Sequence, residues 1–153
     1  MTELDSRQVL AVKSAWGLEH EVFLKLVKVV NELSYEIEVL LKEQGLSSAH
    51  YNILRILRGA GEEGLACSAI GERLLVKSPD ITRLLDRLEK QELIERARSL
   101  VDRRIVTSCL SEKGQKLLAA LDEPMKQLHK KQLEHLGETK LEQLSKLLDD
   151  IQN

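Results

Sequence analysis

The segment from Val76 to Leu93 constrains this chain most, because it predicts a short helix with one apolar and one polar, partly basic face. Ser78 is a favourable N-cap, and Pro79 fits the first helical position, where a missing N–H costs nothing. Four apolar residues then recur at helical spacing: Ile81, Leu84, Leu85 and Leu88. The residues predicted to face outward are Thr82, Arg83, Asp86, Arg87 and Lys90. Taken alone, the pattern fits an ordinary surface helix as well as one that enters a DNA major groove.

Two short strands are expected after this helix. Residues 93–98 partly alternate in polarity, residues 105–110 are rich in β-branched side chains, and residues 99–104 connect them. A helix followed by a hairpin with arginines near its tip is the winged helix-turn-helix pattern. Because a narrow minor groove attracts an inserted arginine, Arg104 is expected to enter it, with Asp102 holding its guanidinium by a bidentate pair. The alternative is an exposed hairpin with incidental charges.

The segment from Ser68 to Gly114 resembles the MarR family of bacterial transcription regulators. Four motifs carry the resemblance: SAIGERL at 68–74, TRLLDRLE at 82–89, DRR at 102–104 and LSEKG at 110–114. Each motif is weak alone, but their order and spacing are specific. The resemblance implies a single domain over 1–153, mainly α with a small β wing. A winged helix-turn-helix lobe at 47–111 would join dimerisation helices at 1–46 and 112–153.

The resemblance also implies a function. The chain would be a sequence-specific transcriptional regulator, usually a repressor, that binds a near-palindromic operator in double-stranded DNA as a homodimer. The residues expected to contact DNA are Lys77, Ser78, Asp80, Thr82, Arg83, Arg87, Asp102, Arg103 and Arg104. Asp80 has a second interpretation, as a residue that favours the helix N-terminus. Leu100 and Val101 keep an alternative open, a winged-helix protein-interaction module without DNA binding.

The overall charge does not favour a nucleic-acid-binding protein, since the formal net charge is −2. Its distribution matters more. Residues 73–104 hold nine basic and six acidic side chains, a net charge of +3, and the remaining residues carry −5. Positive charge is therefore concentrated where the motifs would contact DNA, although a solvated helix face gives the same contrast.

The flanking regions predict long helices. Residues 14–44 carry apolar side chains every three to four positions, which predicts one long helix that ends before Gly45. Ser111 is expected to cap a helix to about Leu136, and residues 138–152 carry a narrow apolar stripe. Such a stripe usually needs a partner helix, so both chain ends are expected to build a dimer interface. The alternative is that these helices form an intramolecular layer in a monomer. Residues 1–15 are expected to form an arm or short helix.

Shorter elements lie between these helices. Ser47 is expected to cap a helix to Arg58, and Leu65–Ala66 to add a third strand to the hairpin. Residues 68–75 would form the first helix of the helix-turn-helix. Ala66 stands where the family usually has a Ser or Thr cap. Gly71 within that helix indicates close packing against a neighbour.

A ligand pocket for a small aromatic or anionic effector is implied by the resemblance only. Its candidates are Trp16, His20, Phe23 and Tyr51, for which core or interface packing is the alternative. Cys67 precedes a predicted helix N-terminus, which favours the thiolate, so it is a candidate oxidant sensor; the alternative is an inert small side chain.

Other classes of protein are not indicated. The two cysteines have neither metal-ligand spacing nor the density of a disulfide scaffold, and the four histidines suit the surface or helix ends. No metal, cofactor or catalytic constellation is expected, so an enzyme is not predicted. No signal peptide and no apolar run of about 18 residues is found, and we expect a cytoplasmic protein without membrane partners.

Overall fold

The computed structural model describes residues 13–152, which divide into two compact units, one ending at Glu36 and the other beginning at Ile37. Helix α2 (Lys13–Lys42) contributes to both units. In the first unit, Gly17 breaks the helical geometry with φ 85° and ψ 174°, a conformation that glycine adopts without strain. The sequence predicted one uninterrupted helix to Gln44, so both the kink and the earlier end correct that prediction. The arm expected at 1–15 lies outside the described residues, apart from its last three.

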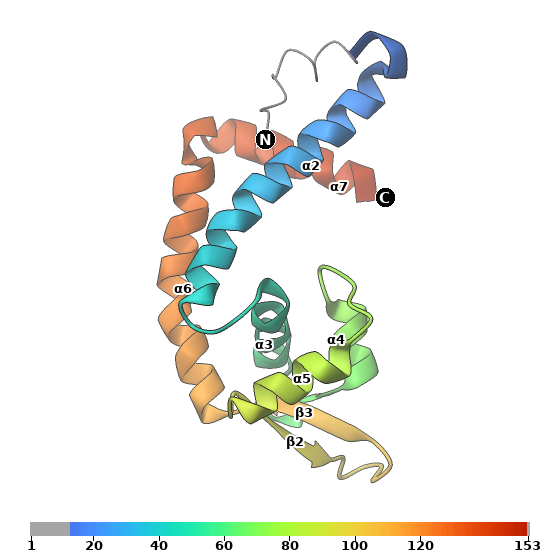
Figure 1. Ribbon diagram of the computed structural model, residues 1–153, viewed down its shortest axis with the longest axis vertical. Coiled ribbons are helices and arrows are strands. Elements are labelled where there is room, and N and C mark those ends of the chain that lie inside the picture. Colours follow the sequence, from blue (N-terminus) through green and yellow to red (C-terminus); the bar gives the residue numbers. More distant parts are fainter. Residues whose placement is uncertain (1–12, 153) are drawn as a thin grey trace, which may run out of the picture. The chain divides into compact units, whose positions relative to one another are not determined.

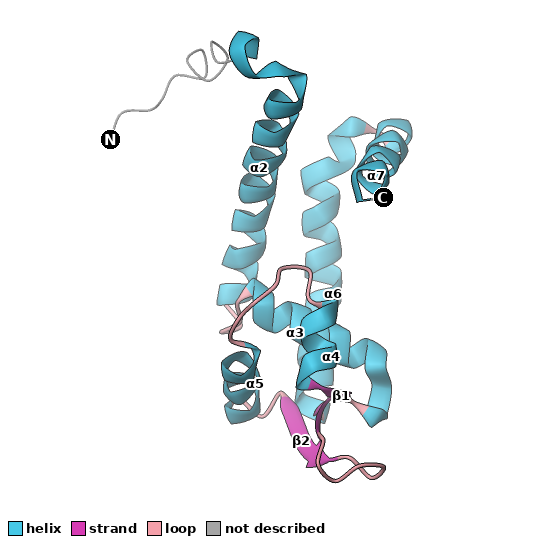
Figure 2. Cartoon of the chain, turned by 90° about the vertical axis from the view of Figure 1, so that its right-hand side faces the viewer, coloured by secondary structure: helices cyan, strands magenta, loops and turns pink. Residues whose placement is uncertain are grey.

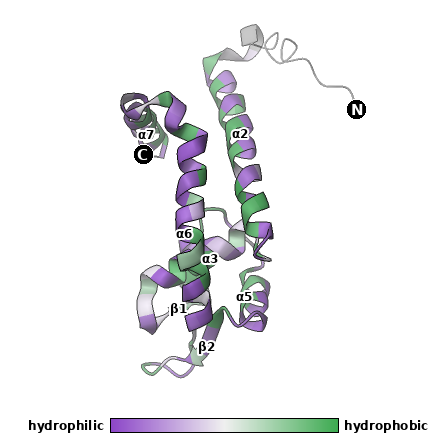
Figure 3. Ribbon diagram, turned by 90° about the vertical axis from the view of Figure 1, so that its left-hand side faces the viewer, coloured by the Kyte–Doolittle hydropathy of each residue, from purple (hydrophilic) through white to green (hydrophobic). Residues whose placement is uncertain are grey.

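The first unit exposes most of its large apolar side chains. Figure 3 shows apolar positions along α2, and the exposed ones in this unit are Trp16, Leu18, Val22, Phe23, Val27, Val29, Val30 and Tyr35. Soluble monomers rarely expose contiguous apolar patches of this kind. The periodicity that predicted a long helix therefore produces an amphipathic helix with an exposed apolar face.

The second unit begins with the last turn of α2 and helix α3 (Ser48–Ala60). Ser47 caps α3 as predicted, because its Oγ accepts the backbone N–H of His50 at 3.2 Å. His50 Nδ1 in turn accepts the Ser47 backbone N–H at 3.3 Å, which completes a reciprocal capping box. Gly45 ends the preceding turn with a φ of 68°, as the sequence predicted.

A short 3-10 turn, η1 (Gly61–Glu63), precedes strand β1 (Leu65–Ala66) and helix α4 (Cys67–Arg73). Ala66 is the N-cap of α4 and makes no side-chain capping hydrogen bond, as expected for alanine. The prediction for Gly71 is confirmed, because a Cβ there would lie 2.5 Å from Ile81 Cδ1 of the next helix. Glycine therefore lets α4 and α5 pack closely.

Helix α5 (Ile81–Lys90) begins two residues later than predicted. Asp80, not Ser78, is the N-cap residue, and Pro79 lies in the preceding turn. The Ser78 Oγ accepts the Asp80 backbone N–H at 3.4 Å. This local bond satisfies the side chain in a turn before the helix, which is why the expected cap does not form.

Strands β2 (Ile94–Arg98) and β3 (Val106–Leu110) form the predicted hairpin. The sheet order is β1-β3-β2 with antiparallel pairing, which confirms the third strand at Leu65–Ala66. The register places Ile94 opposite Leu110 and Arg98 opposite Val106. Figures 1 and 2 show the sheet at one end of this unit, beside α5.

Helix α6 (Glu112–Leu133) is capped by Ser111, whose Oγ accepts the Gly114 backbone N–H at 3.0 Å. It ends three residues before the predicted Leu136, and the 3-10 turn η2 (Glu134–Leu136) follows. Helix α7 (Glu138–Gln152) has the predicted bounds and no fully buried residue. The exposed apolar residues of α7 are Leu144, Leu147, Leu148 and Ile151.

The core of the second unit joins residues from helices α2 to α6. Its fully buried side chains are Leu41, Ile53, Leu54, Leu57, Ile70, Leu88 and Leu118. Among residues 13–152, no helix is long and apolar enough to cross a membrane. The same residues contain no group of three or more acidic, cysteine or histidine side chains arranged to hold a metal ion.

Candidate nucleic-acid interface

Helix α5 presents a polar face and buries an apolar one, as predicted. Leu85 and Leu88 are buried, while Ile81 and Leu84 are half-buried. The exposed residues of its polar face are Thr82, Arg83, Asp86, Arg87 and Lys90, as predicted, together with Glu89. The core therefore holds the helix by one side and leaves three cationic side chains facing solvent.

The start of α5 places Asp80 beside Arg83. Arg83 Nη1 lies 3.5 Å from Asp80 Oδ2, a loose and exposed pair. The position of Asp80 at the N-cap agrees with its second interpretation, as a residue that favours the helix N-terminus. The Arg83 side chain is 85% exposed, so its guanidinium can exchange this carboxylate for another anion.

Lys77 connects the loop before α5 to the end of α4. Its Nζ donates to the carbonyl oxygens of Gly71 and Glu72 at 3.2 and 3.1 Å. A cation at these carbonyls satisfies acceptors that the helix leaves free and complements the helix dipole. Lys77 thus stabilises the turn between the two helices.

Arg96 on β2 holds the wing to α5, and sequence analysis did not single it out. Its Nη1 lies 2.8 Å from Asp86 Oδ1 and its Nε lies 3.7 Å from Glu89 Oε2. Its Nη2 also donates to the Thr82 carbonyl at 3.4 Å. The side chain is only 21% exposed, so these contacts are partly shielded from water. In the sequence, the acidic residues Asp86 and Glu89, three positions apart on α5, were the feature that could have indicated this contact.

The tip of the hairpin, residues 99–105, is an ordered turn. The Ser99 N–H donates to the Ile105 carbonyl at 2.8 Å, and the Ile105 N–H donates to the Asp102 carbonyl at 3.0 Å. Ser99 Oγ accepts the N–H groups of Val101 and Asp102 at 3.2 and 3.4 Å. The tip is therefore stabilised by its own backbone and one hydroxyl.

Asp102 does not hold the Arg104 guanidinium as predicted. Its Oδ1 accepts the backbone N–H of Arg104 at 2.9 Å, because an aspartate readily bonds to the backbone two residues on. Arg103 and Arg104 are both exposed, and in the described part of the chain Arg104 forms no ion pair. The Arg104 guanidinium is thus available to an external anion.

His50 lies at a helix end, as one interpretation expected, but it is buried rather than on the surface. Its exposed fraction is 4%, and its Nε2 has no hydrogen-bond partner. Burial lowers the pKa of His50, and the nearby Arg87 cation lowers it further. A hollow of about 520 Å³ beside it is lined by residues that include Ser78, Arg83, Arg87 and Lys90.

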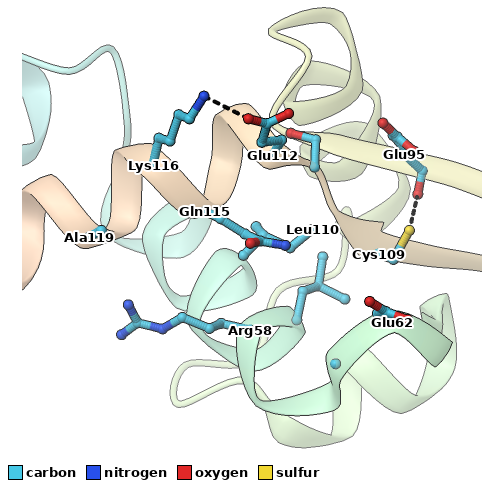
Figure 4. A pocket seen from close by; sticks show the side chains of 12 residues that line it. Arg58, Glu62, Glu95, Cys109, Leu110, Glu112, Gln115, Lys116 and Ala119 are labelled. Atoms are coloured by element: carbon cyan, nitrogen blue, oxygen red, sulfur yellow. Dashed lines mark hydrogen bonds and ion pairs between the residues drawn. The ribbon is translucent and has the colours of Figure 1, made fainter.

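A second hollow of about 730 Å³ lies where α3 and α6 meet β3 (Figure 4). Two of its charged residues form an ion pair, since Lys116 Nζ lies 2.7 Å from Glu112 Oε1. The Cys109 Sγ donates to the Glu95 backbone carbonyl at 3.6 Å. Arg58 in its wall forms two hydrogen bonds to Asp122 at 2.8 and 2.9 Å, which lower the pKa of that carboxyl. No residue of α5 or of the hairpin tip lines this hollow.

The candidate residues for a ligand pocket and for an oxidant sensor remain predictions. The Trp16 and His20 rings lie 5.0 Å apart, and Tyr51 accepts a hydrogen bond from Arg55 at 3.2 Å. Trp16, His20 and Phe23 belong to the first unit and Tyr51 to the second, so a shared ligand pocket stays a prediction. The Cys67 Sγ lies 3.9 Å from Thr82 Oγ1, and its sensor role also stays a prediction.

The chain is similar in sequence and in fold to known proteins. The model of the MarR family matches residues 46–106, the segment that contains α3, α5 and the hairpin tip. A MarR transcription factor from Planctomyces limnophilus has a solved structure with 38% sequence identity and a TM-score of 0.69; the match covers 87% of this chain and 96% of that one. The transcriptional regulator YpoP of Bacillus subtilis, uncharacterized, is 32% identical over 114 residues, 74% of this chain and 77% of YpoP. This chain belongs to the MarR family.

Two further proteins match over a shorter span or at lower identity. The transcriptional repressor MdtR of Bacillus subtilis is 32% identical over 103 residues, and this chain spans 65% of its length. The Staphylococcus aureus MepR–DNA complex shares the fold, with 21% identity, a TM-score of 0.73 and coverage of 86% of this chain and 94% of that one. The expected fold, mainly α with a small β wing, is confirmed.

Proposed function

We propose that this MarR-family chain is a sequence-specific DNA-binding transcriptional regulator. The observation that carries the proposal is the pairing of an exposed, partly basic α5 face with an ordered basic wing in one unit. Relatives named as transcriptional regulators and a repressor support it, as does MepR, which shares the fold and was solved with DNA. These relatives are regulators, and we propose no enzymatic activity.

Each element would have its own task on DNA. The polar face of α5 would enter the major groove, where Thr82 and Arg83 reach base edges and Arg87 contacts phosphate. Arg104 would enter the minor groove, since the structure leaves its guanidinium exposed. Ser78 and Arg103 would contact the sugar-phosphate backbone of the DNA. The bonds of Lys77 and Asp102 suit them better to hold the α4–α5 turn and the wing tip that carry these contacts.

The proposed assembly is a homodimer in the cytoplasm. Exposed apolar side chains on residues 13–36 and on α7 support it, because such surfaces usually need a partner. Two α5 helices would then enter successive major grooves about 10 base pairs apart on a near-palindromic operator. Repression relieved by a small aromatic or anionic ligand, or by oxidation, follows from the family resemblance.

The second candidate function is a protein-interaction module without DNA binding. Leu100 and Val101 at the hairpin tip are fully exposed, and apolar side chains at such a position also suit a protein partner. The two functions differ in their dependence on arginine and on salt. Phosphate contacts release counterions, so DNA binding weakens steeply as salt rises.

The test begins with selection of duplexes from a random 24-base-pair library against the full chain. Binding of the selected duplex is then measured by fluorescence polarisation for the wild type, Arg83→Ala, Arg104→Ala and Lys130→Ala. We expect each arginine variant to weaken binding by about 1–3 kcal/mol, and Arg104→Ala to reduce the salt slope by about one. Lys130→Ala, which removes a charge from α6, should change little. Unchanged binding in both arginine variants would overturn the site, and selection of no duplex at low salt would support the second function.

A further inference from the structure

The wing tip projects two apolar side chains entirely into solvent. The exposed fractions are 101% for Leu100 and 98% for Val101, the highest among the exposed large apolar side chains of the described residues. Solvent exposure of isolated apolar residues is common, but two fully exposed neighbours at the point of a hairpin form a small apolar cap. None of their apolar surface is used within the described chain.

Hydrogen bonds within the hairpin tip hold the backbone of this apolar cap, Leu100 and Val101, in a defined turn. The Ser99 hydroxyl accepts the backbone N–H groups of Val101 and Asp102, and the Ile105 N–H donates to the Asp102 carbonyl. These bonds fix the turn from which both side chains project. A preorganised contact loses less conformational entropy on binding than a mobile one.

The surroundings of the cap are cationic. Exposed Arg98, Arg103 and Arg104 flank it along the chain, and the one acidic side chain of the tip, Asp102, is bonded to the Arg104 backbone. A small apolar centre between guanidinium groups complements a surface with apolar walls and anionic edges. The DNA minor groove has that chemistry, because deoxyribose faces line it and phosphates border it.

We infer that Leu100 and Val101 pack against the deoxyribose walls of the minor groove beside Arg104. The inference rests on the proposed function and adds a contact that carries no charge. Such a contact strengthens binding by burying apolar surface and releases no counterions. Its loss should therefore lower affinity by the same factor at every salt concentration, unlike the loss of an arginine.

The experiment uses the full chain and the duplex selected against the wild type. Three proteins are compared by fluorescence polarisation from low to moderate salt: the wild type, Leu100→Ser/Val101→Ser, and the apolar control Leu100→Met/Val101→Ile. We expect the serine pair to bind on the order of tenfold more weakly with an unchanged salt slope, and the control to bind as the wild type does. Thermal melting should be the same for all three, because neither side chain is buried in the chain.

Three results would overturn the inference. The serine pair could bind as tightly as the wild type, or its loss of affinity could come with a reduced salt slope, or the apolar control could lose as much affinity as the serine pair. If the wild type selects and binds no duplex at all, the proposed function fails and this inference falls with it. If the wild type binds DNA and the Leu100→Ser/Val101→Ser variant binds equally well, only the wing-tip contact is ruled out and the proposed function stands.

Discussion

At the scale of single residues, Arg96 holds helix α5 to the wing, and His50 lies buried beside it. Arg96 reaches from β2 to Asp86 and Glu89 and ties the wing to α5. His50 takes part in the cap of α3 through Nδ1, its Nε2 is buried without a hydrogen-bond partner, and the Arg87 charge lowers its pKa. Both residues therefore help to set the surroundings of exposed side chains on α5.

The buried ring of His50 makes stability depend on pH. Burial and the Arg87 cation hold its pKa below the ordinary value of 6.5, so the folded state resists protonation more than the unfolded chain does. As pH falls through about 6.5, the unfolded state binds a proton that the folded state refuses, and the free energy of unfolding decreases. We predict this decrease in urea titrations of the wild type between pH 7.5 and 5.5.

His50→Gln isolates this effect, because glutamine serves at the same position of a capping box and does not titrate. Its free energy of unfolding should fall less than that of the wild type over the same pH range. His129→Gln, which removes an exposed histidine from α6, should leave the wild-type dependence intact. Equal pH dependence in His50→Gln and the wild type would contradict the assignment.

Sequence patterns predicted which α5 residues face outward, because helical periodicity separates the two faces directly. They did not predict the role of Arg96, because the acidic pair on α5 does not show which cation of the sheet lies opposite it. The Asp102 contact was also wrong, because the same spacing allows a bond to the Arg104 guanidinium or to its backbone. Only the turn conformation decides between them.

At the scale of elements, close approach between backbones fixes where helix α6 begins. Ser111 caps the helix, and its Oγ also donates to the Glu92 carbonyl at 2.7 Å. A Cβ at Gly114 would fall on the Leu93 carbonyl oxygen, which belongs to backbone and cannot swing away. The junction between the wing and α6 therefore requires glycine at this position.

Gly114→Ala should destabilise the protein despite the better helix propensity of alanine. Overpacking of this kind typically costs about 1–3 kcal/mol. The matched control is Gly59→Ala in α3, where an added Cβ meets nothing within 4 Å and helix propensity predicts a gain of up to about 1 kcal/mol. Urea unfolding measures both, and a Gly114→Ala protein as stable as Gly59→Ala would contradict the packing argument.

Most element positions followed from the sequence, whereas several ends did not. Residues 138–152 and the three-stranded sheet were predicted because periodicity and β-branched runs are local signals. The start of α5 was misplaced because Ser78 and Pro79 suit a helix start and a turn equally well. The break at Gly17 was missed because the apolar repeat continues across it.

At the scale of the whole molecule, the exposed apolar surfaces of the described residues support the proposal of a homodimer. The first unit exposes a long row of apolar side chains, and α7 has no fully buried residue. Apolar periodicity predicted both surfaces, because it shows which residues need burial. It does not show which chain covers them, so the homodimer and the division into dimerisation helices and a winged-helix lobe at 47–111 remain proposals.

Hydroxyl-radical footprinting of the selected duplex tests the central claim, that two copies of this chain bind DNA through α5 and the wing. We expect two groups of protected positions about 10 base pairs apart, related by the near-palindromic symmetry of the site. Protection of the minor groove outside each group should be lost with Arg104→Ala. A single protected stretch, or none at saturating protein and low salt, would show that two copies do not bind DNA in this way.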